Sequence, residues 1–247
     1  MKSRSPQPQL ANLPDYKVRE SHKAKHVNLK ISPHDGLEIV VPKGFDHRRI
    51  PEILQRKQKW INKIAQQFEA QQEFLTPTAP DQQVTEIVLQ AIAETWQVEY
   101  YPTTDPHVTV TEKSGQKLQV RGAINHTELC HKALCQWLAH KARTHLVPWL
   151  RTVSNEIQLP FAKASVRGQK TRWASCSQQK AISLNYKLLF LPPDVVRYVF
   201  VHELCHTIHM NHSAAFWQLV GEKDPNYEPL DADLHNVWRY IPVWVEQ

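Results

Sequence analysis

Residues 192–212 read PPDVVRYVFVHELCHTIHMNH, and this stretch decides how the rest of the chain is interpreted. It contains His202, Glu203 and His206 in an H-E-x-x-H pattern. Side chains four residues apart lie on one face of a helix, so both imidazoles can bind one metal ion. The Glu203 side chain is angled away from both, within reach of a water on that metal, whose pKa zinc lowers toward ~7. The pattern therefore predicts a metal site where a glutamate removes a proton from water.

The residues around the pattern predict a buried helix. Pro192 and Pro193 suit a helix start, because a proline in the first position loses no intrahelical hydrogen bond. Apolar residues cover most of the circumference, namely Val195, Val196, Tyr198, Val199, Phe200, Val201, Leu204 and Ile208. Two histidines and a glutamate in so apolar a helix cost free energy unless something satisfies them, and a metal would. The alternative is a chance H-E-x-x-H on a structural helix.

A zinc hydrolase needs a third protein ligand and an open fourth position, and His212 is our first choice for that ligand. It lies six residues after His206, which is the ligand spacing of the metzincin pattern. In that pattern a glycine ends the helix, but here the position holds His209. Asn211 could make the turn instead, because Asn tolerates the left-handed conformation.

Two other choices for the third ligand remain open. One is a carboxylate further along the chain, Glu222 or Asp231, as in a gluzincin-like site. The other is His209, which shares the helical face of His202 and His206. At 1.5 Å per residue, however, His209 lies ~10 Å along the axis from His202, which strains joint coordination. We rank His212 first, the carboxylate second and His209 third.

The composition is that of an ordinary globular protein. The 247 residues are 41% hydrophobic and 22% charged, with a net charge of +6 and a pI near 9.1. No apolar run is long enough for a transmembrane helix, and the polar start predicts no secretory signal. The four cysteines form no C-x-x-C pair, so we expect a reducing, cytoplasmic location. Without a long apolar run, we expect no membrane association.

The N-terminal part predicts two strands and a helix. Residues 16–31 and 37–41 carry apolar positions on either side of a Pro33-His34-Asp35-Gly36 turn, so we expect a β-hairpin. Residues 46–74 have helical apolar spacing. The basic residues of this predicted helix are the best candidate in the chain for a nucleic-acid surface, although an exposed helix face explains them equally well. These residues are Arg48, Arg49, Arg56, Lys57, Lys59 and Lys63.

The middle of the chain predicts strands and one long helix. Residues 75–83 look like a linker, and three strands are expected over Glu86–Tyr101, His107–Glu112 and Lys117–Arg121. The first of these is ambiguous, since IVLQAIAETW also has helical propensity. Residues 126–150 have helical spacing, with Thr127 as a possible cap.

Residues 164–191 predict paired strands that lead into the metal helix, with a hairpin turn at 177–180. An exposed strand edge beside the metal could hold an extended peptide. Arg172 and Trp173 either line that cleft or cover the core. Further on, an apolar helix with Phe216, Trp217 and Val220 is expected to pack under the metal helix. Three residues of the C-terminal region could donate to an oxyanion or serve in packing: Tyr227, His235 and Tyr240.

The chain resembles the YgjP-like metallopeptidases, a family related to the SprT-like and WLM-type zinc proteases. The residues that carry the resemblance are YKVRESHKAKHVNLKI with LEIVVPKG, the helix containing Trp60, TRWASCS with ISLNYKLLFLPP, and VHELCHTIHMNHSAAFW. The resemblance implies zinc bound by His202, His206 and His212, with Glu203 as the general base. Ala174 stands where the family usually has Gly, and residues 76–125 and 226–247 match the family weakly.

The expected fold is α+β, with a small sheet packed on the H-E-x-x-H helix as in zincins and an N-terminal β-β-α portion. The expected parts are a tail over 1–15, the β-β-α portion over 16–75, a linker with strands over 76–125 and a catalytic portion over 126–247. The predicted function is a Zn²⁺-dependent peptidase acting on peptides or proteins. The alternatives are a SprT-type protease associated with DNA and a non-catalytic metal-binding protein, in which a fourth ligand such as His209 or His235 closes the site. The sequence does not indicate an oligomeric state.

Overall fold

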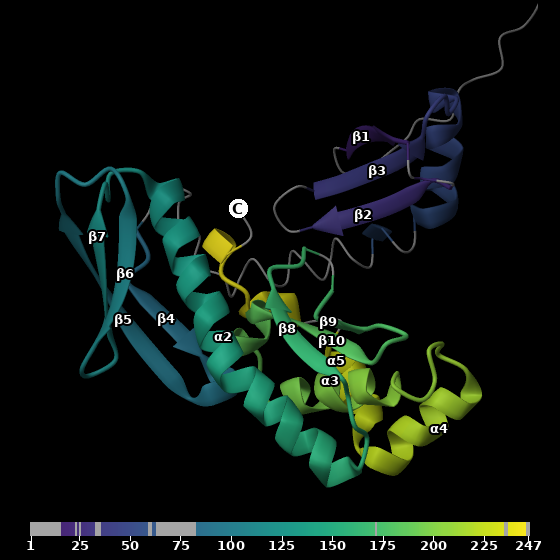
Figure 1. The fold of residues 1–247 in the computed structure, drawn as a ribbon. Coiled ribbons are helices and arrows are strands. Elements are labelled where there is room, and N and C mark those ends of the chain that lie inside the picture. Colours follow the sequence, from purple (N-terminus) through teal and green to yellow (C-terminus); the bar gives the residue numbers. More distant parts are fainter. Residues whose placement is uncertain are drawn as a thin grey trace, which may run out of the picture. The chain divides into compact units, whose positions relative to one another are not determined.

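The chain divides into two compact units, Met1–Pro77 and Thr78–Gln247 (Figure 1). The computed structural model describes residues 16–22, 24, 26–32, 36–58, 61–62, 83–170, 172–234 and 237–245. The expected tail over 1–15 and nearly all of the expected linker therefore lie outside the described residues, as does His235.

The first unit is a small sheet with a helix. Strands β1 (Tyr16–Ser21), β2 (Asn28–Ser32) and β3 (Gly36–Pro42) are in the order β1-β3-β2. Strands β2 and β3 are antiparallel, which confirms a hairpin here, although its turn at 33–35 is outside the described residues. The prediction of a single strand over 16–31, and with it a β-β-α portion, is wrong, because this segment forms two strands, β1 and β2, on opposite sides of β3. β1 pairs with β3 in parallel. After the short η1 (His47–Arg49), residues 50–58 and 61–62 are helical. The buried core of this unit is Leu37, Ile39, Val41, Ile50, Leu54 and Ile61.

The second unit begins with a four-stranded sheet in the order β4-β5-β7-β6. Its strands are β4 (Glu86–Leu89), β5 (Glu94–Pro102), β6 (Val108–Lys113) and β7 (Lys117–Gly122). The prediction of one strand over 86–101 is wrong, because β4 and β5 are separate antiparallel strands. Between them lie the short η2 (Gln90–Ile92) and Ala93, whose left-handed φ of 52° reverses the chain. A non-glycine residue at positive φ leaves no turn signal in the sequence.

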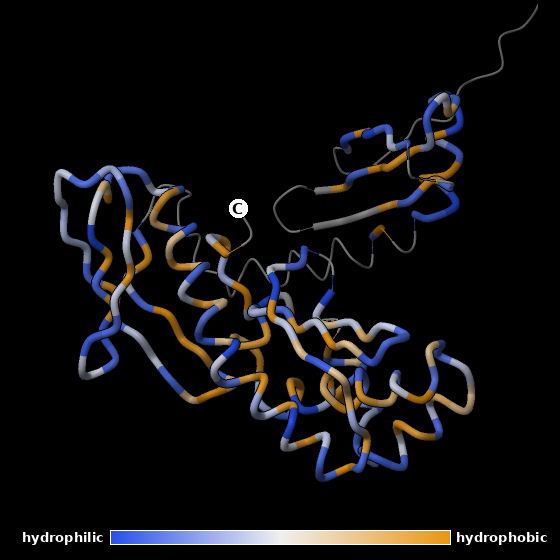
Figure 2. Tube along the Cα trace, in the orientation of Figure 1, coloured by the Kyte–Doolittle hydropathy of each residue, from blue (hydrophilic) through white to orange (hydrophobic). Residues whose placement is uncertain are grey.

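A long helix, α2 (Thr127–Ile157), follows the sheet and contacts both β6 and the later β8. It ends seven residues later than predicted, at Ile157, and keeps Pro148 within it. The residue that caps α2 is His126, with no side-chain hydrogen bond, so the suggestion that Thr127 caps it is wrong. Hydrophobic and hydrophilic residues alternate along α2 (Figure 2), as expected for a helix with one buried face.

A three-stranded sheet in the order β8-β10-β9 precedes the metal-site helix. It contains β8 (Lys163–Arg167), β9 (Ala174–Cys176) and β10 (Ala181–Asn185). β9 and β10 form the predicted antiparallel hairpin, with the Lys180 N–H donating to the Ser177 carbonyl at 2.8 Å. β8 pairs with β10 in parallel. Among the described strands β9 pairs with β10 alone, so β9 has a free edge.

The remaining elements of the second unit are mostly helical. They are η3 (Tyr186–Phe190), α3 (Pro193–Cys205), α4 (Ala214–Lys223), α5 (Tyr227–Leu234), η4 (Val237–Tyr240) and η5 (Val243–Val245). Helix α3 contacts α2, α4, α5 and β9, and one hydrophobic core runs through this unit. The mixed α+β class with small sheets is as predicted. In the described part of the chain, no helix is long and apolar enough to span a membrane.

Candidate metal centre

Helix α3 carries the H-E-x-x-H residues, and its local sequence explains where it begins. Pro192 is the N-cap and Pro193 the first helical residue, as expected for residues that need no intrahelical donor. Asp194 lies in the first turn, where a negative charge favours the helix dipole. Nine of its thirteen residues are buried. The helix ends at Cys205, so His206 is the C-cap and begins the segment that leads to His212.

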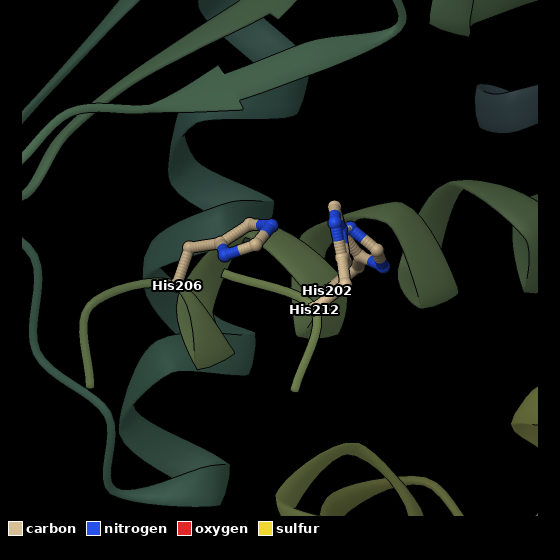
Figure 3. Close-up of side chains that lie close together, drawn as sticks. All are labelled: His202, His206 and His212. Atoms are coloured by element: carbon tan, nitrogen blue, oxygen red, sulfur yellow. Dashed lines mark hydrogen bonds between the residues drawn. The ribbon is translucent and has the colours of Figure 1, made fainter. Parts of the chain in front are cut away.

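Three histidines meet at the end of α3 (Figure 3). The ligand atoms of His202, His206 and His212 all lie within 4.8 Å of one another. The Nε2 atoms of His202 and His212 are 3.1 Å apart. Two nitrogens bound to one tetrahedral zinc at ~2.0–2.1 Å stand about 3.3 Å apart, so this pair already has a suitable separation. The structure thus brings together the three histidines that the sequence ranked first.

The chain turns back toward the metal site without a left-handed residue. The described non-glycine residues with positive φ are Ala93, Gln116, Gln158 and Lys180, so a left-handed turn at Asn211 is wrong. Instead, the end of the helix tightens. The amides of Ile208 and His209 both donate to the Cys205 carbonyl at 3.0 Å, and the Thr207 hydroxyl donates to the Leu204 carbonyl at 2.7 Å. These bonds satisfy the last helical carbonyls and direct the segment toward His212.

His206 is held by its own loop. Its Nδ1 lies 2.8 Å from the His209 carbonyl, which fixes the proton on Nδ1 and leaves Nε2 as the donor for a metal. Its ring stacks on Phe216 of α4, with ring centroids 4.5 Å apart. Burial lowers the pKa of His206, which favours the neutral form that a metal requires. His209 therefore contacts the site through its backbone, and its imidazole is not in the cluster.

His202 is supported from the opposite side by Tyr198 and Asp231. The Tyr198 hydroxyl donates to Asp231 Oδ1 at 2.6 Å and lies 3.4 Å from His202 Nδ1. Burial, and then the neighbouring histidines, lowers the pKa of His202 to about 4. Neither carboxylate proposed as the third ligand belongs to the cluster. Asp231 accepts from Tyr198, and Glu222 accepts from Gln218 at 3.1 Å on the surface of α4.

His212 comes from the exposed segment between α3 and α4 and depends on ring packing. Its imidazole stacks on Trp217 with centroids 5.7 Å apart, and Trp217 stacks in turn on Tyr227 of α5, also at 5.7 Å. Tyr227, a possible oxyanion donor, thus lies on the far side of the Trp217 ring. Tyr240 was also expected as a possible oxyanion donor, and its hydroxyl accepts a hydrogen bond from Arg239 at 3.0 Å.

Glu203 has a buried carboxylate that the chain satisfies only in part. The residue is 7% exposed, and burial raises its pKa to about 8 although the Arg172 charge and a hydrogen bond from the Cys176 N–H act in the opposite direction. Within the described chain, Glu203 Oε2 is buried and has no hydrogen-bond partner. A buried polar atom without a partner costs about 1–3 kcal/mol, so this oxygen is suited to a group that the chain itself does not supply.

The Cys176 amide is a contact that sequence reasoning missed. On β9, the Trp173 carbonyl accepts from the Asn185 N–H, and the Ser177 N–H donates to the Ala181 carbonyl. Backbone groups alternate sides along a strand, so the groups of Ala174 and Cys176 point away from β10. The free edge of β9 therefore faces Glu203, and one of its amides is bound there.

The residues present fit a metal ion. Three neutral imidazoles supply nitrogen ligands of the kind that zinc and related transition metals prefer, and they leave further coordination positions open. Glu203 follows His202 directly in the chain, and its buried Oε2, which has no partner in the described chain, is suited to accept from a water on such an ion.

Comparison with known families agrees with this geometry. The family model described as YgjP-like, metallopeptidase domain, matches residues 25–237. The chain belongs to this family. The match covers most of both units, and the family description implies a metal ion and a metal-dependent peptidase. A search of curated proteins found no match to the chain.

Proposed function

We propose that the protein is a zinc-dependent peptidase with His202, His206 and His212 as ligands and Glu203 as general base. The observation that carries the proposal is the joint arrangement of three converging imidazoles and a buried carboxylate oxygen without a partner. A non-catalytic structural site would use four protein ligands, whereas the metal-ligand cluster of the described residues has three. A structural site also has no use for a buried base.

A zinc ion in this site would acidify a water and polarise the carbonyl of the substrate. The chain's own residues would do the rest. Glu203 would accept the proton of the water at Oε2 and later transfer it to the leaving amine. The Cys176 N–H lowers the pKa of the Glu203 carboxyl against the effect of burial, while Oε2 has no partner in the described chain and is available for this transfer. Tyr198 and the His209 carbonyl keep the Nε2 atoms of His202 and His206 unprotonated.

The fold supports a zincin-like arrangement in which the small sheet lies on α3. The free edge of β9 is beside the base, and its Ala174 backbone groups point away from β10. A peptide in extended conformation could add to this edge, which would bring its backbone toward Glu203. The charge of Arg172, an exposed residue just before β9, lowers the pKa of the Glu203 carboxyl against the effect of burial.

The first test combines metal analysis with proteolysis. Wild-type protein should contain about one zinc per chain and cleave an unfolded substrate such as casein. A chelator should abolish cleavage and added zinc should restore it. His212→Ala should lose both zinc and cleavage, whereas His209→Ala should keep zinc. Wild-type protein that binds no zinc on reconstitution, or that binds zinc and cleaves neither casein nor a peptide library, would overturn the proposal.

A second candidate, a protease that also binds nucleic acid, is favoured by the distribution of charge. Residues 1–77 contain 14 Lys and Arg against 8 Asp and Glu, a net charge of +6, whereas residues 78–247 contain 16 against 16. The entire net charge thus lies in the first unit, where Arg48, Arg49 and Lys43 are exposed. Such an asymmetry is typical of a surface for an anionic partner.

The test of this second candidate is DNA binding at several salt concentrations. Binding should weaken steeply with added salt, because phosphate contacts release counterions. Arg48→Ala with Arg49→Ala should weaken it further, while the matched pair Arg143→Ala with Arg151→Ala in the neutral unit should not. Absence of binding at low salt would remove this candidate and leave the peptidase proposal untouched.

A further inference from the structure

Two residues of helix α5 contact side chains that pack against the candidate metal ligands, although α5 supplies no residue of the histidine cluster. Tyr227 and Asp231 are four residues apart on α5, so they project from one face of the helix. Each contacts an aromatic residue of another helix: Asp231 contacts Tyr198, which contacts His202, and Tyr227 contacts Trp217, which stacks on His212 and also contacts the edge of the His202 ring. The two chains of contacts start from different residues of α5 and pass through different aromatic residues, and they meet at the cluster, where the Nε2 atoms of His202 and His212 are 3.1 Å apart.

The first chain of contacts is a hydrogen-bond relay. Tyr198 donates its proton to Asp231 Oδ1 in a short bond of 2.6 Å, as expected for a carboxylate acceptor. The phenolic oxygen is then available to accept from the Nδ1–H of His202, 3.4 Å away. A proton held on Nδ1 leaves the lone pair on Nε2, which is the atom that faces His212 Nε2 at 3.1 Å. Asp231 thereby determines which nitrogen of His202 is available to a metal.

The second chain of contacts is a stack of rings. Tyr227 lies nearly parallel to Trp217, at an interplanar angle of 22°, and Trp217 lies nearly parallel to His212, at 26°. His212 is in an exposed segment rather than a helix, so its ring orientation depends on packing against Trp217 and against the edge of Phe216. Gly221 on α4 makes room for Tyr227, because a Cβ there would lie 3.3 Å from the tyrosine ring. The small residue and the ring therefore fit together.

We propose that α5 is the positioning element of the metal centre. Asp231 orients His202 through Tyr198, and Tyr227 orients His212 through Trp217, while neither residue binds the metal or the substrate. The inference rests on the proposed zinc site and adds to it the residues that prearrange two of its three ligands. Contacts of this kind usually contribute 10–100-fold to metal affinity.

The test is zinc affinity, measured on the full chain by competition with a chromophoric chelator. Tyr198→Phe, Asp231→Ala and Tyr227→Ala should each weaken zinc binding by about 10–100-fold. Tyr227→Phe keeps the stacked ring and should bind zinc like the wild type. Asp233→Asn is the matched control, because this exposed carboxylate on the same helix should leave the affinity unchanged.

Double variants separate positioning from general damage. Tyr198→Phe and Asp231→Ala act in one relay, so together they should weaken binding little more than either alone. Asp231→Ala and Tyr227→Ala act through different aromatic residues, so together they should weaken binding more than either alone. Thermal unfolding of the zinc-free variants identifies any variant that fails to fold. If Tyr198→Phe fails to fold, the relay through Tyr198 is tested with Asp231→Ala alone.

The outcomes distinguish this inference from the proposed function. Folded variants that all bind zinc within about threefold of the wild type would overturn the role of α5 and leave the three-histidine site intact. Equal losses in Tyr227→Phe and Tyr227→Ala would overturn the stacking relay. Absence of zinc binding by the wild type would instead overturn the proposed function itself.

Discussion

Two clusters of polar groups in the second unit are each built around a buried side chain, and they differ in whether the chain satisfies that side chain. One surrounds Lys141 on α2. The Lys141 ammonium lies 3.0 Å from Glu94 and 3.6 Å from Glu112, and 4.4 Å from the centre of the Trp96 ring. The indole N–H groups of Trp96 and Trp137 donate to the same two carboxylates, each at 2.8 Å. This cluster joins β5 and β6 to α2.

The other cluster is the candidate metal centre, where a buried polar group lacks a hydrogen-bond partner in the described chain. Glu203 Oε2 is buried and has no hydrogen-bond partner among the described residues. The Nε2 atoms of His202 and His212 lie 3.1 Å apart, a separation that suits two ligands of one metal ion. The Lys141 cluster therefore stabilises the fold, whereas the Glu203 cluster requires a ligand. Buried polar groups that lack a partner are a better indication of a functional site than buried polar groups as such.

The largest effect is expected for Glu203→Gln. Turnover should fall at least ~100-fold, because the amide cannot accept the proton of a water. Zinc content should be unchanged, and the free energy of unfolding should stay equal or rise by about 1 kcal/mol, since a neutral amide is less costly to bury. The measurements are peptide cleavage, metal content and urea unfolding, with the exposed Glu222→Gln as control. Full activity in Glu203→Gln would falsify its role as the base.

Zinc binding should raise the stability of the protein by binding to the histidine cluster, and the Lys141 cluster should have no part in this effect. At ~100 times its dissociation constant, zinc should raise the free energy of unfolding by about 2.7 kcal/mol. Differential scanning fluorimetry of chelator-treated protein with and without zinc measures this. His206→Ala should show no such shift, while Lys141→Met should show the full shift from a lower starting stability. An equal shift in His206→Ala would mean that zinc acts elsewhere.

Lys141→Met should destabilise the fold without affecting the reaction. The substitution keeps most of the side-chain volume but leaves two carboxylates without their cation, at a cost of about 2 kcal/mol. This is less than for a fully buried pair, because Glu94 and Glu112 are 20% and 41% exposed. Urea unfolding measures the loss, and Lys132→Met on the exposed face of α2 is the matched control. If Lys141→Met is as stable as the wild type, the cluster does not have the structural role assigned to it.

The smallest effect is expected at an exposed ion pair. Arg197 lies 2.7 Å from Glu156, but the two side chains are 40% and 49% exposed. Arg197→Ala should therefore cost less than about 1 kcal/mol of stability. The same urea titration detects it. A loss as large as that of Lys141→Met would show that burial does not account for the difference between these pairs.

The sequence by itself determined the features that depend on local spacing. The four-residue interval between His202 and His206 determines that they share a helical face, and the prolines before α3 mark its start. The hairpin turn at 177–180 also follows from nearby residues, since turn chemistry is local. His212 was the preferred third histidine from its spacing alone, and the structure brings it to the other two.

Tertiary structure decided what depends on residues far apart in the chain. Tyr198 and Asp231 are 33 residues apart, and Trp137 and Glu112 are 25 apart, so no local pattern marks either pair. The break at Ala93 was missed for a related reason. The apolar run Ala91-Ile92-Ala93 contains no glycine or proline, and only the antiparallel pairing of β4 with β5 reveals the reversal. Side-chain spacing determines which groups can share a face, but only packing determines which distant groups meet there and which remain without a partner.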